Sequence, residues 1–354
     1  MSKISRLLRW ANVILIFFTF FAYLAPYISP VNFWPLAFFG LIYPWLLLFN
    51  LLFIAIWAAR RRWYFLFSLG CILLGWNHFR SIVGLSLSTA PISEDRTISV
   101  MSFNAHNLEN FRVRRQFAMN EDLAAIFDKG DASIVCFQEF YIYGDLTDDY
   151  IHYLTKEKGL INHTWQRRRE LAIFTSFPIL QTETKQFNNA NGYQFVDVNV
   201  KGTRIRVFNI HLQSNSVSSA AERLAANGDI QEKETWLEIR GMMGRFKRAV
   251  QKRAIQAEEV AAQIAKSPYP VIVCGDFNDI PQSYAYRTIA EGMNDAFRQR
   301  GSGLGFTYIG RIPALRIDYI LTSQHWRILN FDMRRTSFSD HRALGSRIEL
   351  LESE

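Results

Sequence analysis

The first 93 residues contain no Asp or Glu, and this gap constrains the chain more than any other feature. Three long apolar runs lie within it, at about residues 8–28, 35–59 and 63–85. Each comes close to the roughly 20 residues that a helix needs to cross a bilayer. The first run is too long for the apolar core of a signal peptide, and no small-residue cleavage site follows it. We therefore predict a membrane region over residues 1–91 with three transmembrane helices.

Basic residues predict the orientation of this region. Lys3, Arg6 and Arg9 flank the first apolar run, and three arginines at 60–62 separate the second run from the third. The loop between the first two runs is uncharged. Because loops rich in Lys and Arg stay on the cytoplasmic side, we expect an integral protein of the cytoplasmic (inner) membrane with a cytoplasmic N-terminus. Three crossings place the remaining residues outside the cytoplasm, in the periplasm of a Gram-negative cell.

The remaining residues, 92–354, have a different composition. Of the 40 basic and 32 acidic residues in the chain, 33 and 32 lie here, so the net charge of +8 comes almost entirely from the membrane region. A nucleic-acid-binding domain needs clustered Lys and Arg to neutralise phosphates. The nearly neutral balance of this part does not indicate one. An apolar content of 49% also excludes a disordered chain.

Apolar strand-like runs alternate with segments of helical periodicity after residue 96. Strands are expected at 97–103, 132–137, 171–175, 194–200, 203–210, 269–274, 316–321 and 342–348. Helices are expected at 117–128, 146–158, 218–266 and 283–291, the third with breaks near Gly228, Gly241 and Gly244. This mixture of hairpins and crossovers is typical of an α/β sandwich, and the length suffices for one large core.

Polar residues follow several of these strands, and one lies within the strand expected at 316–321. They are Asn104, Glu139, His211, Asp276, Asn278, Asp318, Asp340 and His341. A single such residue usually closes a turn. A set of carboxylates, amides and two histidines is harder to explain in that way, because ligand sites collect at strand ends in α/β proteins. We interpret the set as one site.

The same residues fall in six short motifs: Ser102-Phe103-Asn104, Gln138-Glu139, Asn209-Ile210-His211-Leu212, Gly275-Asp276-Phe277-Asn278, Arg316-Ile317-Asp318-Tyr319 and Ser339-Asp340-His341. In content and order they resemble the endonuclease/exonuclease/phosphatase superfamily, which includes pancreatic-type DNases, abasic-site endonucleases, inositol polyphosphate phosphatases and neutral sphingomyelinases. The resemblance covers about residues 97–350. It implies a four-layer α/β sandwich, two packed mixed sheets flanked by helices, in a catalytic domain of residues 92–354. It also implies metal-assisted hydrolysis of phosphate esters.

The resemblance implies a metal site. Glu139 would hold a divalent cation with Asn104 beside it, and Asp340 would be a further ligand. Oxygen donors of this kind suit Mg²⁺ or Mn²⁺. His106 departs from the pattern, because some family members carry an acidic residue there that helps to hold metal. We interpret His106 as a residue of the rim, and one metal or two remain open.

The resemblance also implies catalytic roles. His341 would be the general base or contact the phosphate, and Asp318 would accept its other ring N–H and fix its orientation. Asp276 and Asn278 would position the attacking water and the phosphate. His211 would donate a hydrogen bond to a non-bridging phosphate oxygen, so Asn278 and His211 are also expected to bind substrate.

The substrate is less constrained. Four features slightly favour a lipid head group or small phosphodiester as substrate. They are the membrane region, the short connector at 88–95, the near-neutral charge of residues 92–354, and the run His211-Leu212-Gln213, which is similar to the sphingomyelinase branch. The segment 236–263 is either a basic amphipathic helix on anionic lipid or an ordinary helix packed on the sandwich. The alternatives are an extracytoplasmic nuclease acting on DNA and an inactive scaffold. The expected partners are the lipid bilayer and a phosphoester substrate, and nothing points to a protein partner.

Overall fold

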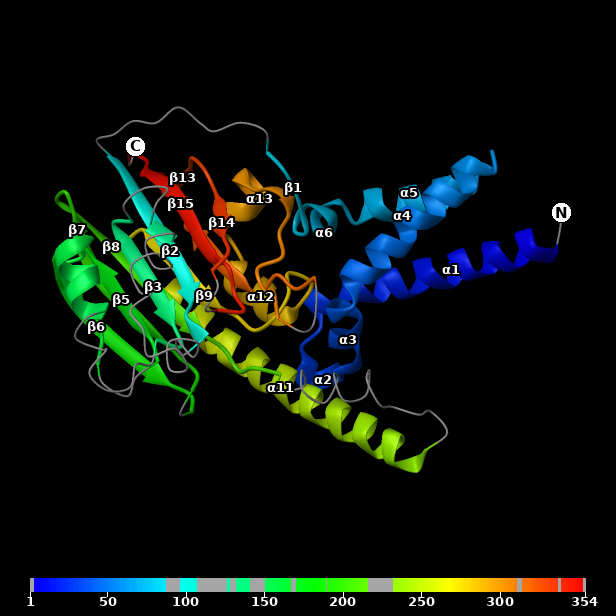
Figure 1. Ribbon diagram of the computed structural model, residues 1–354, viewed down its shortest axis with the longest axis horizontal. Coiled ribbons are helices and arrows are strands. Elements are labelled where there is room, and N and C mark those ends of the chain that lie inside the picture. Colours follow the sequence, from blue (N-terminus) through cyan, green and yellow to red (C-terminus); the bar gives the residue numbers. More distant parts are fainter. Residues whose placement is uncertain are drawn as a thin grey trace.

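The computed structural model describes residues 3–86, 96–106, 126–127, 132–140, 150–166, 170–188, 190–215, 232–310, 314–336 and 339–352. A helical arm extends from one side of an α/β sandwich, with the N-terminus at the outer end of the arm (Figure 1). Most of the expected helix at 117–128 and the break near Gly228 lie outside the described residues.

Two mixed sheets form the sandwich. One has seven strands in the order β13-β15-β2-β3-β5-β4, with β14 also paired to β15. Its strands are β2 (Thr97–Asn104), β3 (Ile134–Gln138), β4 (Asn162–His163), β5 (Ala172–Thr175), β13 (Trp326–Ile328), β14 (Asp332–Arg334) and β15 (Ala343–Leu350). The other has six strands in the order β10-β12-β9-β8-β7-β6. Its strands are β6 (Ile179–Gln186), β7 (Gly192–Val200), β8 (Thr203–His211), β9 (Val271–Asp276), β10 (Asn294–Asp295) and β12 (Asp318–Thr322).

The two-residue alternation of strands divides the apolar side chains into three layers. Between the sheets lies a core that includes Val100 and Cys136 from one sheet and Val207 from the other. The outer face of the six-stranded sheet packs against α11 (Lys233–Ala265) and α12 (Tyr284–Ala290). The outer face of the seven-stranded sheet is covered by residues around the π-helical turn η4 (Tyr153–Glu157). The prediction of an α/β sandwich with two packed mixed sheets is confirmed.

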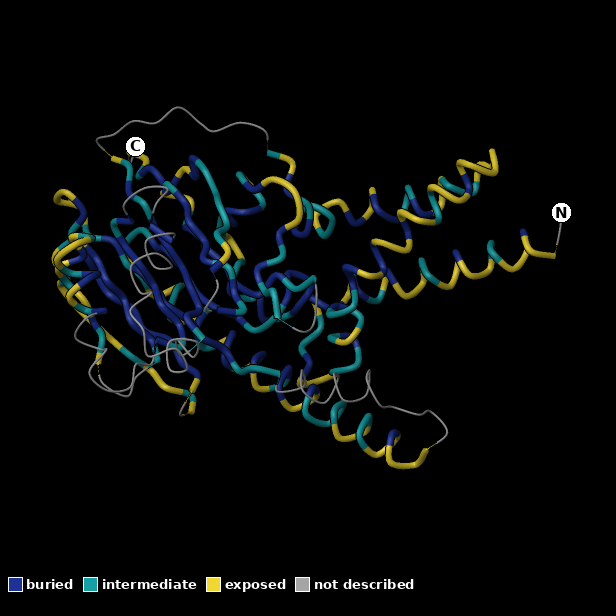
Figure 2. Tube along the Cα trace, in the orientation of Figure 1, coloured by how far each residue is buried: buried dark blue, intermediate teal, exposed yellow. Residues whose placement is uncertain are grey.

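The arm has the opposite distribution of polarity. It consists of α1 (Lys3–Leu24), η1 (Ala25–Tyr27), α2 (Pro30–Phe33), α3 (Pro35–Leu41), α4 (Tyr43–Ala59), α5 (Phe65–Leu74) and α6 (Trp76–Arg80). Asn12, Asn50 and Ser68 are buried between the helices, and large apolar side chains such as Phe17 face outward. Asn12 Nδ2 donates to Ser68 Oγ at 2.7 Å, and Asn50 Nδ2 donates to the Thr19 hydroxyl at 3.0 Å. Figure 2 shows the exposed residues running along the arm.

Among the described residues, the structure does not confirm three transmembrane helices: one helix passes on length and composition, or two if a bent pair counts as one span. One segment, Lys3–Tyr27, is long and apolar enough to cross a membrane, and only 17% of its apolar window is buried. Pro35–Leu41 and Tyr43–Ala59 pass the same test only together, and they bend by 57° at their junction. The third expected span contains the 10-residue helix α5, about half the length needed to cross the hydrocarbon core. Its last residues form β1 (Val83–Leu85) instead.

The arm and the sandwich share direct contacts. β1 pairs with β11 (Ser302–Leu304) in a two-stranded antiparallel sheet. The buried Gln282 donates to Ser81 Oγ at 2.8 Å and to the His78 carbonyl at 3.3 Å. A Cβ on Gly40 would lie 2.5 Å from the Gln282 carbonyl oxygen, so only glycine allows α3 to approach this closely.

The helix α11 links the two regions. It is continuous for 33 residues, so the expected breaks near Gly241 and Gly244 are wrong. Its carboxyl-terminal part packs on the six-stranded sheet through Ala257 and Val260. Its middle part packs on the arm, where Phe246 and Val250 contact residues of α3 and its flanks. These contacts support an ordinary packed helix over this part of the segment.

Candidate active site

The candidate site lies at the edge of the apolar core between the two sheets, where polar side chains replace apolar ones. On β2 the side chains of Ile98 and Val100 point into this core, and the same alternation brings Asn104 to the inner face at the strand's end. On β9 the corresponding terminal residue is Asp276. β12 runs antiparallel to β9, and its first residue, Asp318, pairs with Asp276. The polar ends of strands from both sheets therefore meet at one edge of the sandwich.

A buried amide pair joins the two sheets beneath this edge. Gln138 Nε2 at the end of β3 donates to Asn209 Oδ1 on β8 at 2.6 Å. Asn209 Nδ2 donates back to the carbonyls of Phe137 and Ala172, at 2.8 and 3.1 Å. Both amide side chains are fully buried. Sequence reasoning included them in motifs without a role, and the structure shows that they hold the two sheets in register under the site.

Asn104 connects two carboxylates across the sheets. Its Nδ2 donates to Glu139 Oε1 at 3.1 Å and to Asp276 Oδ2 at 3.0 Å. Its Oδ1 accepts the backbone N–H of His106 at 3.0 Å. Glu139 and His106 both have positive φ, at 49° and 46°. Such backbone strain is uncommon outside glycine and collects at functional sites.

The turn after β9 is equally constrained. Asn278 has a φ of 52°, its N–H donates to Asp276 Oδ1 at 2.7 Å, and its side chain donates to the Leu212 carbonyl at 3.0 Å. A Cβ on Gly275 would lie 2.1 Å from the Ile210 carbonyl oxygen, and its φ is 153°. Glycine is therefore required for β9 to deliver Asp276 beside β8.

His341 and Asp318 form a buried pair. His341 Nδ1 lies 3.0 and 3.1 Å from the two Asp318 carboxylate oxygens, and its Nε2 lies 3.9 Å from Asp276 Oδ2. Burial by itself would lower the pKa of His341, but the charges of Asp318, Asp276 and Asp340 raise it to about 10. Burial and the Asp318 charge raise the pKa of Asp276 to about 6. The aromatic ring of Tyr308 packs edge-on against the imidazole at 5.2 Å.

His211 lies on the opposite side of the carboxylates. Its Nε2 is 3.6 Å from Glu139 Oε1 and 3.9 Å from Asp276 Oδ2, and its Nδ1 is 3.8 Å from Glu170 Oε2. Burial raises the pKa of Glu170 to about 7, with His211 lowering it and Glu139 raising it. Sequence reasoning missed Glu170, because no motif contains it. The only signal was its place directly before the buried strand β5.

The donor atoms suit a hard divalent cation. Asp340 Oδ1 lies 3.2 Å from His106 Nδ1, which is 3.9 Å from Glu139 Oε2, so His106 sits between two of the predicted ligands. Asp340 Oδ1 is buried and has no hydrogen-bond partner among the described residues. Ligand atoms of Asp276, Asp318 and His341 also lie within 4.8 Å of one another. Carboxylate oxygens dominate the set, as Mg²⁺ and Mn²⁺ prefer.

The eight residues selected from the sequence thus gather at one edge, through the contacts given above. Asn104 presents its amide nitrogen, rather than its oxygen, to the neighbouring carboxylates. Acidic groups, two histidines and amide donors in one buried cluster can hold a cation, orient water and contact phosphate oxygens.

Comparison with known proteins agrees with this geometry. The endonuclease/exonuclease/phosphatase family matches residues 101–341, and a domain of unknown function (DUF8431) matches residues 5–82. No curated protein sequence matches the chain. An endonuclease/exonuclease/phosphatase from Beutenbergia cavernae is 15% identical with a TM-score of 0.50, covering 72% of each chain. ANGEL2, a 2′,3′-cyclic phosphatase solved with adenosine-2′,3′-vanadate, is 15% identical with a TM-score of 0.52, covering 75% of this chain and 99% of the other.

These two structures share the fold of the sandwich, and the family match spans more than half of the chain, including all six motifs between residues 101 and 341. The chain therefore belongs to the endonuclease/exonuclease/phosphatase family and is a metal-dependent phosphoesterase.

Proposed function

We propose that this protein is a membrane-anchored phosphodiesterase that acts on phosphoesters at the membrane surface, with lipid head groups or small phosphodiesters favoured over DNA. The observation that carries the proposal is the continuity between the catalytic turn and the arm. The turn that holds Asp276 and Asn278 leads within a few residues to Gln282, which bonds to Ser81 and packs on Gly40 of the arm. These contacts hold the active site close to the arm, and therefore close to the medium that surrounds the arm.

The polarity of the arm supports a bilayer as its surroundings. Buried Asn and Ser side chains with outward apolar ones are the reverse of a water-soluble bundle, and interhelical polar contacts are common in membrane proteins. Arg60 Nη2 donates to Ser5 Oγ at 3.0 Å, and the Arg9 guanidinium lies 5.8 Å from the Tyr64 ring. The basic residues therefore share the outer end of the arm. The positive-inside rule then places that end in the cytoplasm and the domain of residues 92–354 outside it.

We assign the following roles at the site. A bound Mg²⁺ or Mn²⁺, held by Glu139 and Asp340 with Asn104 beside it, would offset the negative charge that develops on the phosphate. With its pKa raised to about 10, His341 contacts the phosphate as a cation; it would take a proton from the attacking water where a bound metal ion offsets the carboxylate charges that raise this pKa. Asp318 holds its ring through Nδ1.

The remaining residues orient water and phosphate. Asp276 lies 3.9 Å from His341 Nε2, where it can position the attacking water. His211 donates to a phosphate oxygen. Asn278 Nδ2 donates to the Leu212 carbonyl and to Asp276 Oδ2, and the proposed contact of Asn278 with phosphate would replace the longer bond to Asp276. The buried His211 nitrogens have no hydrogen-bond partner among the described residues, which leaves them available to a ligand.

The test is a hydrolysis panel with the full-length protein in detergent micelles and in vesicles, with Mg²⁺, Mn²⁺ or EDTA. The substrates are choline and glycerol phospholipids, nitrophenyl diesters and monoesters, a nucleoside 2′,3′-cyclic phosphate, and plasmid and single-stranded DNA. We expect metal-dependent cleavage of a lipid or small diester, abolished in Asp318→Asn, with Arg96→Gln at the far end of β2 as the matched surface control. Nicking of plasmid with lipids and diesters intact would show a tethered nuclease, and no cleavage in vesicles would support a scaffold.

A further inference from the structure

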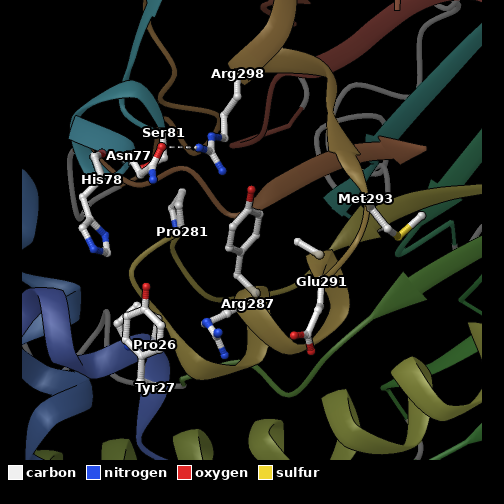
Figure 3. A pocket seen from close by; sticks show the side chains of 12 residues that line it. Pro26, Tyr27, Asn77, His78, Ser81, Pro281, Arg287, Glu291, Met293 and Arg298 are labelled. Atoms are coloured by element: carbon white, nitrogen blue, oxygen red, sulfur yellow. Dashed lines mark hydrogen bonds between the residues drawn. The ribbon is translucent and has the colours of Figure 1, made fainter. Parts of the chain in front are cut away.

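A pocket lies at the junction of the arm and the sandwich, and none of the predicted catalytic or metal-binding residues lines it (Figure 3). It has a volume of about 240 Å³. Residues of η1 and α6 form one wall, and residues of α12 and of α13 (Ala296–Arg300) form the other. Because η1 directly follows α1, the pocket lies at the inner end of a helical segment, Lys3–Tyr27, that is long and apolar enough to span a membrane.

Two arginines enter this pocket from opposite sides, as Figure 3 shows. Arg287 is exposed and its guanidinium lies 4.2 Å from the Tyr27 ring centroid. Arg298 is half-buried and donates from Nη2 to Asn77 Oδ1 at 3.3 Å. Glu291 also lines the pocket, but among the described residues no carboxylate lies within ion-pair distance of either guanidinium.

We propose that this pocket binds the phosphate of an anionic phospholipid head group, or a phosphate monoester of the same chemistry. Guanidinium groups present several N–H donors in a plane that matches phosphate oxygens. Tyr27, at the end of the candidate span, is the type of aromatic residue that collects at the membrane–water interface. The volume is smaller than that of pockets for drug-sized ligands, and it suits a head group.

The pocket also touches the catalytic turn. Pro281 lines it, and the next residue, Gln282, bonds to Ser81, which lines it too. A bound phosphate would therefore contact both sides of the junction at once. The inference rests on the membrane anchoring proposed above, but binding in this pocket requires no residue of the active site.

The test measures the thermal unfolding midpoint of the full-length protein in neutral detergent with EDTA, so that metal-dependent chemistry is absent. The additions are phosphatidylglycerol, phosphatidylcholine, glycerol 1-phosphate and inorganic phosphate. The variants are Arg287→Gln, Arg298→Gln and their combination, with Arg96→Gln as the matched control. His341→Ala serves as a background in which the catalytic edge is altered.

We expect phosphatidylglycerol, but not phosphatidylcholine, to raise the midpoint in wild type, Arg96→Gln and His341→Ala. The half-saturating concentration should rise about tenfold or more in each single arginine variant, because each loses a charge-assisted contact. An equal shift with glycerol 1-phosphate would show that the phosphate group suffices, whereas a shift with the lipid alone would show that the chains are required.

An undiminished lipid shift in the double variant, or no shift with any phosphate compound, would overturn the proposal. If the double variant does not fold, the single variant Arg287→Gln provides the test. Arg287 is exposed, so its replacement leaves the packing between the arm and the sandwich unchanged. Loss of hydrolysis with retained binding would count against the proposed catalytic function and not against this pocket.

Discussion

The arm and the sandwich follow opposite rules for burying side chains. In the sandwich, mostly apolar residues fill the space between the sheets, and the predicted site residues gather where strands end, at the catalytic edge. In the arm, Asn12, Asn50 and Ser68 are buried beside an apolar core, and many large apolar side chains, such as Phe17, are exposed. In both regions buried amide nitrogens donate across an interface, as Asn50 does to Thr19 and Gln138 does to Asn209, so the two regions differ mainly in their outer surfaces. Under the proposed anchoring, this difference reflects a bilayer around the arm and water around the sandwich.

The largest effect is expected at the catalytic edge. Replacing His341 with Ala should lower kcat by about a thousandfold, because it removes a group that transfers a proton or contacts phosphate. The unfolding midpoint should also fall, because the substitution leaves the buried Asp318 carboxylate without its partner, so kcat is compared well below the midpoint of the variant. Steady-state kinetics with the substrate found in the panel provides the measurement. Activity above a tenth of wild type would rule out the assigned role.

Removing a buried amide should distinguish the two regions. Asn209→Leu leaves Gln138 and two backbone carbonyls without their partner, and should cost about 3 kcal/mol. Asn50→Leu breaks one interhelical contact to Thr19 and should cost about 1 kcal/mol or less, as such contacts do in membranes. Thermal unfolding of the full-length protein in detergent compares them. Equal losses would contradict the idea that the two regions meet different solvents.

The ion pair of Asp197 with Arg204 and Arg206 should make the stability of the sandwich fall at acid pH. The arm has no acidic residue, so no such loss is expected there. Burial would raise the pKa of Asp197, but its hydrogen bonds and charge contacts with Arg206 and Arg204 lower the pKa overall. A lowered folded-state pKa adds stability above the unfolded value of about 3.9, and that stability is lost as pH falls through the folded pKa. Asp197→Asn should cost about 2 kcal/mol at pH 7 and progressively less below pH 4.

The matching control is Glu183→Gln on the exposed strand β6, which should change the unfolding midpoint little at either pH. A deficit in Asp197→Asn that stays constant down to pH 2 would show that the ion pair does not titrate as proposed.

The smallest effect concerns the helix that joins the regions. Gly241→Ala and Gly244→Ala should each stabilise α11 by about 0.5–1 kcal/mol, because alanine has the higher helix propensity and nearby atoms leave room for a methyl group. Differential scanning calorimetry can detect the combined change. A lower midpoint would mean that the predicted break in this segment has a role in another state of the protein.

The sequence predicted the strands in which most residues are apolar or β-branched. The β-branched run at 97–103 became β2, and the alternating hairpin at 194–210 became β7 and β8. It missed β6, because Ile179–Gln186 is an exposed edge strand with polar residues on both faces. Hydropathy alone also could not separate the short helix α5 from a span, since the break after Leu74 and the pairing of β1 depend on contacts with distant residues.

The candidate site was more predictable than the topology of the arm. Asn104, Asp276 and His341 stand in ordered motifs, and strand ends bring such residues together in this class of fold. Glu170 was missed because its proximity to His211 arises from two strands far apart in sequence. The role of the Gln138–Asn209 pair was likewise invisible, because it requires knowing which strands of the two sheets face each other.

The fixed junction at Gln282 and Gly40 has a kinetic consequence. Under the proposed anchoring, a catalytic edge held against the arm by these contacts would meet membrane substrates by lateral diffusion in a plane. For a lipid substrate, turnover would then follow its mole fraction in the bilayer, so diluting it with inert lipid at constant total amount should slow the enzyme. A water-soluble substrate would instead obey its bulk concentration, whatever the lipid composition.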